Sequence, residues 1–72
     1  MWLIEGALEP ILISEGITLE ELAKDILDCS IEEAKLIISG ETFVGSEQKK
    51  MLFAAFGDDV MQKIIDWEKS KI

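Results

Sequence analysis

The sequence contains neither histidine nor arginine, and it has one cysteine and one proline in 72 residues. With no histidine and with Cys29 as the one thiol, it lacks a set of side chains that would hold a metal ion. It also lacks a glycine-rich phosphate loop and a nucleophile with a base nearby. We therefore expect no enzymatic activity, no metal and no cofactor. Cys29 follows Asp28, and we expect it to be a buried turn residue in a reducing compartment.

Long apolar stretches are missing as well. No run approaches the roughly 18 residues of a membrane-spanning helix, and the opening M-W-L-I-E-G lacks the basic start and apolar core of a signal peptide. We expect a cytoplasmic protein without a membrane contact. No stretch alternates apolar and polar residues as a half-buried strand does, and 49% of the residues are hydrophobic. The sequence therefore predicts one compact all-α domain over residues 1–72.

Apolar residues recur at helical spacing in five segments. The expected helices are residues 2–15, 18–27, 30–39, 46–56 and a last one from Asp58 or Asp59 onward. Pro10 interrupts the first, whose regular part starts either near Leu8 or Glu9, or at Trp2 with a kink. The last is expected to place on its apolar side Val60, Met61, Ile64, Ile65 and Trp67.

The second and third segments stand back to back between Thr18 and Gly40. T-L-E-E and S-I-E-E, which begin at Thr18 and Ser30, each match the capping box that starts a helix. Only Asp28 and Cys29 separate the two helices. A pair joined by so short a break predicts a helix-turn-helix over about residues 18–40, and DNA binding is the first functional hypothesis.

Three stretches in order carry a family resemblance. G-I-T-L-E-E-L-A-K-D-I, S-I-E-E-A-K-L-I-I-S-G and S-E-Q-K-K-M-L-F-A-A-F-G together resemble the lambda-repressor-like family, also called Cro or XRE helix-turn-helix. The resemblance spans about residues 8–57 and is greatest to small phage-regulator and antitoxin-type members. It implies a five-helix fold and a transcriptional regulator that binds duplex DNA.

The chain departs from that family in three ways. Asp28 stands where the family's turn usually has glycine. The segment from Leu22 to Gly40 is one residue longer than the common pattern, so the second helix or the turn holds an extra residue. In the family, polar side chains near the start of the third helix meet base edges, and the matching positions here are Ile31, Glu32, Glu33 and Leu36.

The charge of the same stretch opposes binding to DNA. Residues 18–45 hold seven acids against Lys24 and Lys35, a net charge of −5, and DNA affinity depends on neutralising phosphates. The alternative is an acidic helix-turn-helix module that binds a basic or apolar protein. Such a module is either antitoxin-like or mimics the charge of DNA toward a DNA-binding protein.

Candidate contact residues follow from both hypotheses. Helix N-termini and hydroxyls can hold phosphates, lysines supply charge, and an outward leucine among carboxylates suits a protein partner. The candidates are Thr18, Ser30, Glu32, Glu33, Lys35, Leu36, Thr42 and Lys49. Trp2 and Trp67, near the two ends, are candidate homodimer contacts, because tryptophan is favoured at contact hot spots; packing in the core is the other interpretation of both.

Overall fold

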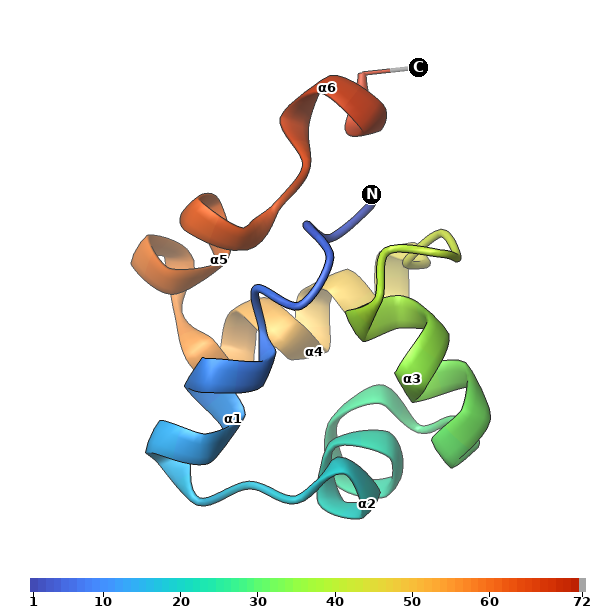
Figure 1. The fold of residues 1–72 in the computed structure, drawn as a ribbon, viewed down its shortest axis with the longest axis vertical. Helices are drawn as coiled ribbons and strands as arrows, with labels where there is room; N and C mark the ends of the chain where they lie inside the picture. Colours follow the sequence, from blue (N-terminus) through green and yellow to red (C-terminus); the bar gives the residue numbers. More distant parts are fainter. Residues whose placement is uncertain (72) are drawn as a thin grey trace.

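The structure, a computed structural model, describes residues 1–71 of the chain (Figure 1). These residues form six α-helices and a π-helix, η1, which continues α2 without a break. The bounds are α1 Glu9–Glu15, α2 Leu19–Glu21, η1 Leu22–Leu27, α3 Ile31–Ile38, α4 Ser46–Phe56, α5 Asp58–Ile64 and α6 Trp67–Ser70. Residues 1–71 form no β-strand, although an isolated antiparallel bridge joins Leu3 to Ile65. The all-α prediction is confirmed.

The helices pack around a shared core. Its buried members are Leu3, Leu8, Leu12, Leu22, Ala23, Leu27, Ala34, Ile37, Ile38, Val44, Leu52, Met61, Ile64 and Ile65. In the view of Figure 1, α4 crosses the back of the molecule behind α1 and α3, and its Leu52 is fully buried. η1 packs against both α3 and α4. Burial of apolar area in this core stabilises the fold by about 25 cal/mol per Å². Since the helices share the core, the position of each helix depends on the others.

The N-terminal segment is not helical, so a kinked helix from Trp2 is wrong. The alternative start is confirmed, because α1 begins at Glu9 with Pro10 in its first turn. Ahead of α1 the chain runs beside the C-terminal segment. Trp2 accepts a hydrogen bond from the Asp66 N–H at 2.8 Å, and the Ile4 N–H donates to the Ile64 carbonyl at 2.8 Å. These bonds satisfy backbone groups that a helix would otherwise have paired.

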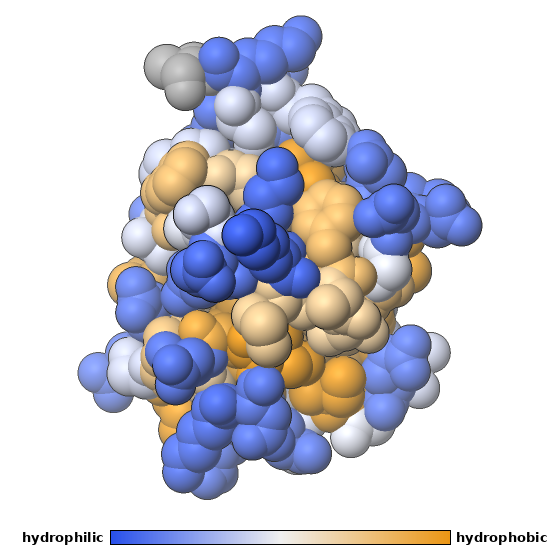
Figure 2. Space-filling view, turned by 180° about the vertical axis from the view of Figure 1, so that it is seen from behind, coloured by the Kyte–Doolittle hydropathy of each residue, from blue (hydrophilic) through white to orange (hydrophobic). Residues whose placement is uncertain are grey.

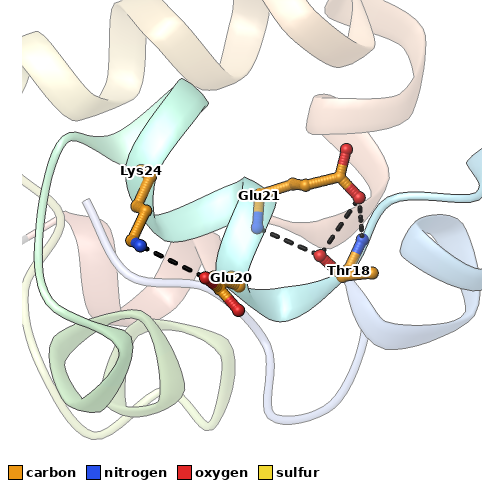
Figure 3. Close-up of polar contacts among 4 residues, drawn as sticks. All are labelled: Thr18, Glu20, Glu21 and Lys24. Atoms are coloured by element: carbon orange, nitrogen blue, oxygen red, sulfur yellow. Dashed lines mark hydrogen bonds and ion pairs between the residues drawn. The ribbon is translucent and has the colours of Figure 1, made fainter.

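A complete capping box starts α2, as the sequence predicts (Figure 3). The Thr18 hydroxyl accepts the Glu21 N–H at 3.1 Å, and the Glu21 carboxylate accepts the Thr18 N–H at 3.2 Å. Lys24 pairs with Glu20 at 3.2 Å one turn apart. Since these bonds occupy the donors left free at a helix start, the acids at this site stabilise the helix.

The continuation of this helix differs from a regular α-helix. Residues 22–27 form the π-helix η1, in which the Asp28 N–H donates to the Ala23 carbonyl, five residues back. Leu22 and Leu27, also five apart, are both buried. An α-helix at about 100° per residue would place them about 140° apart. The wider π-turn brings them to the same side.

A left-handed residue ends η1 and starts the turn. Asp28 has φ 52° and ψ 53°, and it is the one non-glycine residue with positive φ among residues 1–71. Ser30 then caps α3 by accepting the Glu33 N–H at 3.1 Å. The return bond expected from the Glu33 side chain is not formed within residues 1–71, so the second capping box is half complete.

The C-terminal half differs from expectation in where its helices begin and end. α5 ends at Ile64, because Ile65 is extended where it bridges to Leu3. Asp66 then caps a separate α6 by accepting the Lys69 N–H at 3.1 Å. The expected five helices are therefore six, and Trp67 is not part of the apolar side of α5. The apolar spacing also predicts Ser46 as the cap of the fourth helix, but α4 begins at Ser46 itself and its N-cap is Gly45.

Apolar residues around the start of α4 are expected to pack in the core: Phe43 and Val44 from the loop, and Met51, Leu52, Ala55 and Phe56 from the helix. In the loop, Val44 is buried, but Phe43 is 56% exposed. On α4, Leu52 is buried, whereas Met51 and Ala55 are exposed. The inner face of α4 is turned toward Leu52 with Phe53 and Phe56 beside it.

Candidate interaction surface on helix α3

Helix α3 presents one mixed face to solvent. Ala34, Ile37 and Ile38 are buried, while the exposed residues are Ile31, Glu32, Glu33, Lys35 and Leu36. Glu32 and Leu36 are four residues apart and therefore share a side of the helix. The helical spacing of Ile31, Ala34 and Ile38 predicts an inward Ile31, but Ile31 is 37% exposed because it lies in the first turn, at the edge of the core.

Negative charge surrounds the exposed leucine. Leu36 is 44% exposed and has Glu32 one turn before it and Glu33 three residues before it on the same helix. Lys35 is the one base that α3 contains. A phosphate approaching this face would meet two carboxylates for each ammonium, and the repulsion between like charges weakens such contacts.

The other lysines are distributed over several elements, and four of them have side-chain contacts. Lys24 pairs with Glu20, and Lys50 lies 4.0 Å from Glu47. Lys49 on α4 lies over the ring of Phe53, 5.9 Å from its centroid. Burial lowers the pKa of the N-terminal amine, and the charge of Lys49 lowers it further.

The three candidate hydroxyl residues differ in position. Two of them, Thr18 and Ser30, lie at helix starts, and Thr42 lies in a loop. The hydroxyls of Thr18 and Ser30 each accept a backbone N–H of their own helix. Both N-termini therefore already have an acceptor, with carboxylates in the first turn. Thr42 is half-buried in the loop after α3. The hydroxyls of Thr18 and Ser30 therefore act as helix caps.

The two tryptophans have different surroundings. Trp2 is half-buried, packs edge-on against Phe43 at 5.9 Å between ring centroids, and has the Lys69 ammonium 4.4 Å from its ring centroid. Trp67 is 47% exposed, and its indole N–H donates to the Gln62 carbonyl at 3.0 Å. Packing of Trp67 in the core is therefore wrong, and homodimer contacts by either tryptophan stay a prediction.

Cys29 is half-buried in the turn rather than fully buried. Burial raises the pKa of its thiol, and the carboxylates of Glu33 and Asp28 raise it further. Because the thiolate is the nucleophilic form, this environment disfavours reaction at neutral pH.

A groove that the sequence did not predict runs between α1 and α3. We call it the α1–α3 groove; its volume is about 470 Å³, and it is lined by Glu9, Leu12, Ile13, Ile17, Leu19, Lys35 and Ile38. Ile13, on its wall, is 81% exposed. The signal in the sequence is that Ile13 falls outside the apolar stripe of its helix, on the face expected to be polar.

Apolar side chains also reach the surface elsewhere. On the face seen from behind in Figure 2, they form a patch in the middle and lower part, which hydrophilic side chains flank and partly cover. Over residues 1–71, the large exposed apolar residues are Ile4, Ile13, Ile31, Leu36, Phe43, Met51 and Trp67. Apolar patches rimmed by polar residues are typical of protein contact surfaces.

Two kinds of site are not found in the part of the chain that the structure describes. No three side chains of the histidine, cysteine, aspartate or glutamate types converge there as metal ligands. None of its helices has the length and apolar character needed to cross a membrane. Comparison with protein-family models, with curated proteins and with solved structures finds no match to this chain.

Proposed function

We propose that residues 18–40 form a helix-turn-helix unit of the lambda-repressor-like kind with one inserted residue. Asp28 supports this, because it has the left-handed conformation that glycine adopts most readily, and the resemblance expects glycine at this position. η1 supports it as well. A π-turn holds one residue more than an α-turn, which accounts for the excess between Leu22 and Gly40 without lengthening the turn.

We further propose that this chain is an acidic regulatory module that contacts another protein through the outer face of α3. The observation that carries this proposal is Leu36, which is 44% exposed on a helix that also bears Glu32 and Glu33. An apolar residue among carboxylates fits a partner with an apolar pocket rimmed by lysine or arginine. Removing such an anchor from a contact typically costs about 2 kcal/mol or more.

The electrostatics favour a protein partner over DNA. The chain has a net charge of −8 and no arginine, the residue that most often reads guanine. Lys24, Lys49 and Lys50 have contacts within four residues along the chain, and the Lys69 ammonium donates to the Gly40 carbonyl. Nonspecific affinity for DNA comes from lysines and arginines gathered toward phosphates. On α3, the one residue that could contact a phosphate through a positive charge is Lys35.

The test is recovery of a partner from extracts of the source cells with purified chain as bait. We expect the wild-type bait and a Met51→Lys bait to recover the same protein, and a Leu36→Lys bait to lose it. Both positions are exposed apolar residues on helices, so the two variants receive the same change of charge. Circular dichroism checks that all three baits keep their helical content. Equal recovery by all three contradicts the proposal.

A second candidate function is regulation of transcription by binding duplex DNA. The observation that favours it is the capped helix pair itself, with a short turn between η1 and α3. In a helix-turn-helix the second helix enters the major groove. If α3 does so here, Lys35 is its phosphate contact, and Lys35→Ala should weaken binding and flatten its dependence on salt.

A further inference from the structure

The α1–α3 groove carries both halves of an apolar contact. Ile13 projects from its wall and is 81% exposed, the largest exposed fraction among the large apolar residues of 1–71. The apolar residues of the groove itself are Leu12, Ile17, Leu19 and Ile38. A two-fold interface uses the same patch on both copies, so that patch must fit itself. A projecting isoleucine beside an apolar groove meets this condition.

The charges of the groove also complement each other. Glu9 lines it from α1 and Lys35 from α3. Within residues 1–71, the ion pairs at 4.0 Å or less are Lys24–Glu20 and Lys50–Glu47, so Glu9 and Lys35 are not paired with each other. The groove has one acid and one base, whereas the whole chain has a net charge of −8. The groove is therefore locally neutral, and two copies that meet there place no net charge of one sign against each other.

We propose that the α1–α3 groove is the interface of a two-fold dimer of this chain. Ile13 of each copy lies in the groove of the other, and Glu9 of each copy pairs with Lys35 of the other. A partner with a strongly basic surface would instead place like charge against Lys35. This is why a second copy, which brings its own Glu9, is the occupant we infer.

This dimer leaves the outer face of α3 free and does not rest on the protein contact proposed for Leu36. Lys35 and Leu36 are consecutive, so their side chains point about 100° apart around the helix. Lys35 lines the groove, and Leu36 does not. Loss of the dimer and loss of the Leu36 contact are therefore separate results.

Sedimentation equilibrium over a micromolar concentration series tests the dimer. We expect wild-type chain to approach twice the 8.1 kDa mass of one copy. Ile13→Asp should raise the dimer dissociation constant at least roughly tenfold, since it places a charge in an apolar contact twice per dimer. Leu36→Asp is the matched control, because Ile13 and Leu36 are both exposed and each is the third residue from the end of its helix. It should leave the dimer intact.

Charge reversal tests the pairing across the axis. Glu9→Lys alone and Lys35→Glu alone should each weaken the dimer, because each puts like charges together. The double variant should restore it, and thermal unfolding checks that all three fold. Two results overturn the proposal. One is wild-type chain that stays at the mass of one copy, which leaves the groove for some other protein. The other is a dimer whose dissociation constant does not change with Ile13→Asp.

Discussion

Gly40 is the residue at which a single methyl group should do most harm. It ends the α3 region with φ 76°, and a Cβ added there would lie 2.8 Å from the Leu3 carbonyl oxygen. Gly16 has a similar φ of 69° with nothing within 4 Å of such a Cβ. The pair therefore separates the cost of a left-handed alanine from the cost of the close approach.

We expect Gly16→Ala to lower the free energy of unfolding by about 1 kcal/mol, the cost of a left-handed alanine. Gly40→Ala should lower it by at least about 2 kcal/mol, because the N-terminal segment must also move away. Urea denaturation of both variants measures the difference. Equal losses in the free energy of unfolding would contradict this, because the close approach of the Leu3 carbonyl to Gly40 would then add no cost.

Cys29 gives a prediction for pH dependence. Burial, Glu33 and Asp28 all raise the pKa of its thiol, so less thiolate is present at a given pH than for a free cysteine. We expect slow alkylation by iodoacetamide at neutral pH, with a rate that rises as the pH approaches the raised pKa. Glu33→Gln should lower the pKa and speed the reaction, while Glu32→Gln, the neighbouring acid, should not. Equal rates for both variants would contradict this explanation.

At the scale of the element, η1 determines how α2 meets the turn. Leu22 and Leu27 are both buried on the same side of the helix, because the π-helix widens the turn between them. Lys24 and Asp25, between them, are exposed. Removing one of these two would bring Leu27 to the fourth position after Leu22, which an α-helix places on the same face.

We therefore expect deletion of Asp25 to keep a cooperatively folded protein, within about 2 kcal/mol of wild type, with η1 converted to an α-helix. Deletion of Lys35 from the regular α3 is the control. It should abolish cooperative unfolding, because it rotates Ile37 and Ile38 by about 100° away from the core. Thermal unfolding followed by circular dichroism measures both. If the two deletions are equally damaging, η1 does not contain a spare residue.

The helix starts in the first half were predictable because their signals are local. Thr18 and Ser30 cap helices through atoms three residues away, and Pro10 limits α1 through its own ring. The failures come from contacts between distant residues. Ile65 is extended because it meets Leu3, and that contact divides the last helix into α5 and α6. No spacing within residues 58–71 encodes it.

The candidate surface was predictable to the same extent. Helical periodicity was enough to place Glu32, Glu33 and Leu36 on the outside of α3, and all three are exposed. The α1–α3 groove was not, because it forms between helices whose angle depends on the whole core. Ile13 gave the one local sign of it, as an apolar residue outside the apolar stripe of its helix.

On the scale of the whole molecule, charge and fold point to different ligands. The sequence of residues 18–40 resembles a DNA-binding motif, while residues 1–28 alone carry seven acids against one lysine. Electrostatic repulsion of this size acts over about 10 Å at 0.1 M salt and over about 30 Å at 0.01 M. It should therefore oppose an approach to DNA most strongly at low salt, where DNA-binding proteins bind best.

The central claim, that α3 serves a protein rather than DNA, is tested most directly by titrating wild-type chain into a labelled mixed-sequence duplex at about 0.01 M salt and following fluorescence anisotropy. We expect no binding up to about 0.1 mM protein, the weak end of the usual range of dissociation constants for nonspecific complexes at physiological salt. Binding in the micromolar range that weakens with added salt and with Lys35→Ala would contradict the claim and establish the DNA-binding alternative.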